Sequence, residues 1–181
     1  MGKALIIVGS RREGNSYNLA NKIKEELKKD RIVSYIIVPG NQKIHLCTGC
    51  MDCDENGVCD FTDDMKNNID KVLECDTLIF ISPARWNLLS GDIKIFMDRL
   101  NPLYSNKKLK DKKMIAISIG SSAKDTYSTN DVVRSITNFA ESSQMNTILT
   151  YEFNDCLDFT DILEQEDKIN KLIEKIKVIV K

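Results

Sequence analysis

Four cysteines lie close together in the sequence, at a spacing that could hold a metal centre. The segment reads Cys47-x2-Cys50-x2-Cys53-x5-Cys59. Thiolates at this density repel one another unless a metal compensates their charge, and iron–sulfur clusters are commonly held by four cysteines in runs of this kind. Structural zinc usually takes two separated Cys-x2-Cys pairs. The pattern favours an iron–sulfur cluster, with zinc and a loop of free thiols as the alternatives.

A loop near the N-terminus could bind a phosphate. An apolar run is followed by Gly9-Ser10-Arg11-Arg12-Glu13-Gly14-Asn15-Ser16 and then by a helical pattern. A helix N-terminus after a strand offers free backbone N–H groups and the positive end of the helix dipole. Asn15 stands where a triphosphate loop needs lysine, so a single phosphate is expected. A plain turn capped by Asn15 or Ser16 is the alternative. Further donors could come from Ser10, Arg12, Asn15 and Ser16.

A second loop follows the third apolar run and reads Ser82-Pro83-Ala84-Arg85-Trp86-Asn87. In an open α/β sheet, ligands bind beyond the carboxyl ends of the strands where the strand order reverses. We therefore expect this loop to lie beside the phosphate loop. It contains the only tryptophan of the chain, and an aromatic ring with nearby backbone N–H groups suits a flat heterocycle. Packing of Trp86 at a subunit interface is the alternative.

The hydrophobic pattern predicts the elements that must position these loops. Continuous apolar runs predict strands at residues 4–8, 34–38, 77–82, 113–119 and 147–153. Helical periodicity predicts helices at residues 15–29 and 63–74 and around residues 93–100, 132–140 and 169–176. Continuous apolar strands indicate burial on both faces, hence a parallel sheet covered by helices. We expect one doubly wound α/β domain over residues 1–181, with the flavodoxin-like strand order 2-1-3-4-5 and a cysteine-rich loop after strand 2.

Residues 39–61 break this alternation and show neither helical nor strand periodicity. Long irregular segments are usually functional or disordered. Because this one holds four of the six cysteines, we expect it to be functional. Cys75 and Cys156 lie elsewhere and are interpreted as structural.

The composition is that of an ordinary soluble globular protein, with 42% hydrophobic and 29% charged residues. The net charge of −1 gives no support for nucleic-acid binding or for a basic membrane-binding surface. The apolar runs are too short to span a membrane, and we find no signal-peptide pattern. We therefore expect a cytoplasmic protein, in which cysteines serve metal or redox chemistry more than disulfides.

Three features together resemble the NADPH-dependent FMN reductase family and, within it, the iron–sulfur flavoproteins. The first is the phosphate loop, and the second is the cysteine motif with Gly57 and Asp63-Asp64-Met65 after it. The third is Ser82-Pro83 leading to Lys94-x2-Met97-Asp98-Arg99. The resemblance covers residues 1–120. It departs from the family at Arg11, where a proline is usual, and at Pro83-Ala84-Arg85, where Pro-Val-Tyr is usual.

The resemblance implies an FMN site, a cluster and an assembly of several subunits. The residues implied to hold the FMN phosphate are Ser10, Arg12, Asn15 and Ser16. Those implied to lie along the isoalloxazine are Pro83, Ala84, Arg85, Trp86 and Asn87, with Gly120 and Ser121 closing the other side. A 4Fe–4S cluster is implied on Cys47, Cys50, Cys53 and Cys59. The resemblance also implies a homodimer or homotetramer, with the flavin near a subunit interface.

The function expected from these features is that of an FMN-dependent oxidoreductase. Electrons would arrive from NAD(P)H or from a ferredoxin-like donor and leave to a small acceptor. No general acid or base is assigned, because hydride transfer to a flavin needs orientation more than proton transfer. Arg85 could stabilise negative charge on the reduced flavin. A flavodoxin-like electron carrier without turnover and a zinc-stabilised interaction module are the alternatives, and a P-loop nucleotide hydrolase ranks last because its lysine is missing.

Overall fold

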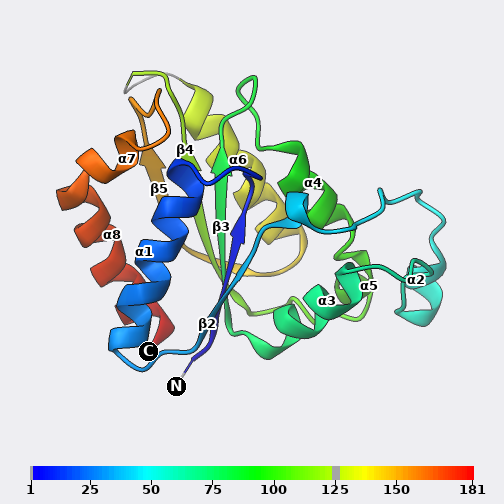
Figure 1. Cartoon of the computed structure of the whole chain (residues 1–181). Helices are drawn as coiled ribbons and strands as arrows, with labels where there is room; N and C mark the ends of the chain where they lie inside the picture. The colour runs from blue at the N-terminus through cyan, green and yellow to red at the C-terminus, as the bar shows by residue number, and fades with distance from the viewer. Residues whose placement is uncertain (1, 124–126) are drawn as a thin grey trace.

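A five-stranded parallel sheet forms the centre of the computed structural model, which describes residues 2–123 and 127–181 (Figure 1). The order of the strands is β2-β1-β3-β4-β5, which confirms the predicted order. The strands are β1 (Ala4–Val8), β2 (Ser34–Ile37), β3 (Thr77–Pro83), β4 (Lys113–Ile119) and β5 (Asn146–Phe153). The order of the strands reverses between β1 and β3, so the loops after these two strands lie side by side.

Helices cover both faces of the sheet (Figure 1). One face carries α1 (Asn15–Lys29), α7 (Asp161–Glu164) and α8 (Glu166–Val180). The other carries α3 (Met65–Glu74), α4 (Gly91–Asp98), α5 (Asn101–Ser105) and α6 (Tyr127–Ser142). None of the described helices is long and apolar enough to cross a lipid bilayer.

Two hydrophobic cores explain why the strands read as continuous apolar runs. Along β1, Ile6 and Val8 pack into the core under α1 and α8, whereas Leu5 and Ile7 pack into the core under α3 and α4. Successive side chains of a strand point to opposite faces, so a strand that is buried on both faces is mostly apolar along its length. The buried polar exceptions in β3 and β4 are Thr77, Ser82 and Ser118. The apolar strand sequences therefore explain why helices cover both faces of the sheet.

The segment between β2 and α3 contains two short helical turns that its sequence pattern does not reveal. A 3-10 turn, η1 (Pro39–Asn41), follows β2, and α2 (Asp52–Asn56) lies among the cysteines. Left-handed residues flank α2, with φ values of 71° at Met51 and 74° at Gly57. These turns agree with the missing periodicity of residues 39–61, because a single turn is too short to show a helical period.

We expect Gly9→Ala to destabilise the protein, because Gly9 is where the phosphate loop passes against α4. A Cβ atom there would lie 2.5 Å from Ser90 Oγ and 2.6 Å from Ile93 Cγ1. Overpacking of this kind costs about 1–3 kcal/mol of unfolding free energy, measurable by urea titration. Gly91→Ala is the matched control, since its Cβ would meet nothing within 4 Å. Equal stability of the two variants would contradict the expectation.

Candidate functional site

A cavity lies at the carboxyl ends of β1, β3 and β4, where the sheet geometry places ligand sites. Its lining includes most of the residues that the sequence predicts for a flavin: Ser10, Arg12, Asn15, Ser16, Pro83, Ala84, Arg85, Gly120 and Ser121. The three loops after these strands therefore meet at one site, as predicted.

The start of α1 supplies the anion-binding end of this cavity. Gly14 occupies the N-cap position in an extended conformation, and no side chain caps the helix there. The first N–H groups of α1 are therefore available to an anion, which also receives the positive end of the helix dipole. Ser10 and Ser16 are buried beside these groups, with exposed fractions of 8% and 3%. The helix therefore does not begin with a simple turn capped by Asn15 or Ser16.

Arg12 and Asn15 join the phosphate loop to the segment after β5. The Arg12 guanidinium carbon lies 4.2 Å from the centre of the Phe159 ring, a cation–π contact. The Asn15 side chain donates to the Asp158 carbonyl oxygen at 2.6 Å and accepts from the Ile162 backbone N–H at 3.1 Å. The Asn15 amide thus fixes the start of α1 against this segment with its oxygen and one of its two N–H groups, which leaves the second N–H for a phosphate.

The segment after β5 contributes cavity residues that the sequence reasoning missed. Cys156, Leu157 and Phe159 line the cavity, together with Ile119 at the end of β4. Their position in the sequence could have revealed them, because they follow the carboxyl end of a strand next to the predicted site. Cys156 is buried, and this burial raises the pKa of its thiol to about 11. The thiol is therefore protonated at neutral pH.

Trp86 and Asn87 do not line this cavity, although the sequence reasoning placed them along the flavin. Arg85 and Leu88 exchange backbone hydrogen bonds of 2.8 and 3.0 Å around them. The φ values are 49° at Trp86 and 62° at Asn87, as in a type I′ turn. The Trp86 side chain is 96% exposed at the tip of this turn. Only the Pro83–Arg85 part of the loop faces the cavity.

The four clustered cysteines line a second cavity, beside the junction of α4 and α5. Cys53 is buried, Cys59 is half-buried, and Cys47 and Cys50 are exposed. The Asn101 side chain donates an N–H to Cys53 Sγ at 3.1 Å. The other side chains that line this cavity include Phe61, Arg99, Asn101 and Pro102. The structure thus gathers the whole predicted ligand set around one space.

The four clustered thiols are not gathered as tightly as the sulfurs around a single zinc ion. Zinc–sulfur bonds of about 2.3 Å in a tetrahedron bring the sulfurs to about 3.8 Å of one another. Within residues 2–123 and 127–181, the one set of three metal-binding side chains with all ligand atoms inside 4.8 Å is Cys50, Asp52 and Asp60. No three of the four clustered thiols lie within that distance of one another. A 4Fe–4S cluster binds its cysteines at four separate irons and so accepts the wider spacing.

The two cavities are separate within one chain. Among the described residues, none belongs to both linings. Figure 1 shows the cysteine segment beside α5, on the opposite side of the molecule from α7 and α8. Within one chain, the two cavities are therefore not joined by a shared lining residue.

Comparisons with known proteins identify the family of this chain. The family model described as NADPH-dependent FMN reductase matches residues 3–156. An iron–sulfur flavoprotein of Methanocaldococcus jannaschii is 31% identical over 121 residues, which is 66% of this chain and 63% of that protein. The aligned part of this chain therefore spans less than two thirds of the length of that relative.

Solved structures show the same fold at low identity. A flavone reductase has a TM-score of 0.73 and 19% identity, covering 98% of this chain and 61% of that one. A flavodoxin, WrbA-like protein from Agrobacterium tumefaciens has a TM-score of 0.64 and 12% identity and is covered completely. These likenesses confirm the flavodoxin-like fold, and the family match extends over most of the chain. The chain belongs to the NADPH-dependent FMN reductase family.

Proposed function

We propose that this chain is an FMN-dependent oxidoreductase that moves electrons between a nicotinamide or ferredoxin-like donor and a small acceptor. One observation carries the proposal: the cavity at the ends of β1, β3 and β4 combines an uncapped helix N-terminus with the loops at Pro83–Arg85 and Gly120–Ser121. The first part suits a phosphate, and the loops offer backbone groups and a slot for a flat ring. The family match supports FMN as the molecule that fills it.

Each part of the cavity has its own role in this proposal. The N–H groups of α1, with Ser10, Ser16 and Arg12, bind the phosphate, while Asn15 holds the helix start in place. FMN supplies the redox chemistry when bound, accepting electrons singly or in pairs. Gly120 lets the β4 loop pack closely, since a Cβ there would lie 2.7 Å from Thr129 Cγ2. Arg85 would stabilise negative charge on the reduced ring.

The second part of the proposal is a 4Fe–4S cluster on Cys47, Cys50, Cys53 and Cys59. Its support is the cavity that all four cysteines line and the N–H of Asn101 at Cys53. The Methanocaldococcus relative carries the name iron–sulfur flavoprotein. Such a cluster passes one electron at a time, so it would couple a two-electron flavin to one-electron partners.

A homodimer or homotetramer in the cytoplasm completes the proposal. Large apolar side chains are exposed near the flavin cavity, with exposed fractions of 96% for Trp86, 76% for Leu157 and 57% for Phe159. Apolar surface of this kind favours burial against another subunit. A second subunit there would also shield the flavin from water and offer a route between the two separate sites.

Arg12→Ala is expected to weaken FMN binding about 10- to 100-fold, because a charged hydrogen bond to phosphate contributes about 1.5–3 kcal/mol. Quenching of FMN fluorescence on titration of the apoprotein measures the affinity. Lys24→Ala is the control, since Lys24 is an exposed cation on the same helix, away from the cavity. An Arg12 variant that binds FMN as tightly as the Lys24 variant would remove Arg12 from the site.

Turnover separates an enzyme from an electron carrier. The proposal predicts steady-state oxidation of NADPH or NADH with a quinone or free flavin as acceptor. A carrier would bind FMN and exchange electrons with a redox partner, yet show no such turnover.

A further inference from the structure

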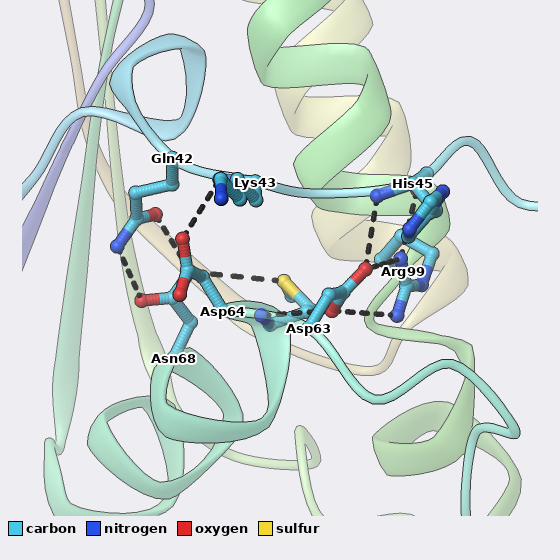
Figure 2. Close-up of polar contacts among 8 residues, drawn as sticks. Gln42, Lys43, His45, Asp63, Asp64, Asn68 and Arg99 are labelled. Carbon is cyan, nitrogen blue, oxygen red and sulfur yellow. Dashed lines mark hydrogen bonds and ion pairs between the residues drawn. The ribbon is translucent and has the colours of Figure 1, made fainter.

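The two ends of the cysteine loop, residues 46–62, are joined by a set of hydrogen bonds (Figure 2). The Lys43 backbone N–H donates to Asp64 Oδ2 at 2.7 Å, and the Asp64 N–H donates back to the Lys43 carbonyl oxygen at 3.1 Å. The His45 N–H donates to Asp63 Oδ2 at 2.9 Å. The chain that enters the loop is therefore bonded directly to the chain that leaves it. We call Lys43, His45, Asp63, Asp64 and Arg99 the clasp.

Arg99 completes the clasp from the end of α4. Its Nη1 donates to Asp63 Oδ2 at 2.7 Å and to the His45 carbonyl oxygen at 2.8 Å, and its Nη2 donates to Asp63 Oδ1 at 3.1 Å. The side chains of Arg99 and Asp63 are only 1% and 3% exposed. One guanidinium thus binds both ends of the loop in a buried, two-pronged ion pair, a geometry that lysine cannot reproduce.

The same guanidinium also faces the cysteines. Arg99 lines the cavity that all four clustered cysteines line, and it has an electrostatic contact with Cys59. Its central carbon lies 5.0 Å from the centre of the Phe61 ring. Its Nε is buried and has no hydrogen-bond partner in the described part of the chain. An orphaned buried donor of this kind calls for a partner, and a cluster or its thiolates would supply an acceptor.

We propose that Arg99 is the positioning residue of the cysteine site. With Asp63 it fixes the cysteine loop before any metal binds, and its positive charge faces the space that an anionic cluster would fill. A loop that is closed beforehand needs less ordering when its ligands meet a metal. A positive charge beside an anionic cluster also favours its reduced form, because net charge and hydrogen bonds set the potential. The effect on the cluster rests on the proposed function, whereas the fixing of the loop does not.

Hydrogen exchange of the full-length, metal-free protein tests the fixing of the loop. In Arg99→Gln, amides across residues 43–65 are expected to exchange at least about tenfold faster than in the wild type, while the strands keep their protection. Lys94→Gln is the matched control, because it removes one charge from the same helix but from an exposed pair with Asp98. FMN binding reports that each variant is folded. If Arg99→Gln does not bind FMN, Arg99→Lys replaces it, with a smaller increase expected.

Loop exchange equal to that of the wild type in the folded Arg99 variant would overturn the proposal, even if a cluster is present. The second readout uses anaerobically reconstituted protein and an iron chelator. Loss of a group that supports metal ligands typically weakens metal binding about 10- to 100-fold, so Arg99→Gln should lose iron correspondingly faster and its cluster should have a lower reduction potential. Iron loss at the wild-type rate contradicts the role of the Arg99 charge. A wild-type protein that takes up no iron would refute the proposed cluster alone, and the exchange result would still decide whether Arg99 fixes the loop.

Discussion

Cys53→Ser is expected to abolish the absorption of the cluster and to remove most of the bound iron, while FMN stays bound. Cys53 is the most buried of the four clustered cysteines, and its sulfur receives the Asn101 N–H. Serine keeps the size of the side chain but loses the thiolate that iron prefers. Because the two cavities have separate linings, the flavin site should not respond. Iron analysis and the visible spectrum measure both effects in one sample.

Cys75→Ala is the matched control for this experiment. Cys75 is fully buried between α3 and β3, away from the cluster cavity. Its burial raises the pKa of its thiol to about 11, so it is a neutral packing group at pH 7. This variant should keep its iron and lose only a small part of its stability. Full iron content in the Cys53 variant, or equal loss in both, would contradict the assigned ligand set.

Asp63→Ala is expected to lower the free energy of unfolding by about 3–5 kcal/mol, because it leaves the Arg99 guanidinium buried without its counter-charge. The hydrogen bonds from the His45 and Met65 amides are lost as well. Asp92→Ala is the control, since it removes a carboxylate from a pair whose Arg11 side chain is 68% exposed. Exposed pairs contribute about 0–1 kcal/mol. Urea unfolding of both variants should separate them clearly, and similar losses would argue against a buried clasp.

The Asp63 carboxylate should also make the stability of the protein depend on pH. Burial alone would raise the pKa of Asp63, but the hydrogen bonds from Arg99 and from the His45 and Met65 amides outweigh it and hold the pKa below its ordinary value of 3.8. The pair therefore contributes its full stability above that ordinary value and loses it as the pH falls through the lowered one. The difference in stability between wild type and Asp63→Ala should stay constant from pH 7 to about pH 4 and shrink only below it.

The fold could be predicted from the sequence because burial on both faces leaves a plain pattern. The helix at Asn15–Lys29 and the strand at Lys113–Ile119 were predicted with the bounds that the structure gives. The short helix Asp52–Asn56 could not be predicted in the same way. A single turn has no period, and its conformation depends on contacts with the rest of the chain.

The candidate site was predictable only where strand ends bring its residues together. The loops after β1, β3 and β4 end at one edge of the sheet, and the sequence order of the strands suffices to place them there. Phe159 and the Arg99–Asp63 pair depend instead on how distant segments dock. Trp86 lies outside the cavity lining because the tight turn that carries it leaves the ring exposed, which a list of residue types does not show.

One measurement tests directly whether this chain binds FMN and also holds an iron–sulfur cluster. This is the visible absorption spectrum of anaerobically purified protein, combined with analysis of iron, zinc and sulfide. We expect flavin bands together with a broad cluster absorption and about four irons per chain. A spectrum without flavin bands would contradict the FMN site, and zinc or no metal in place of iron would contradict the cluster.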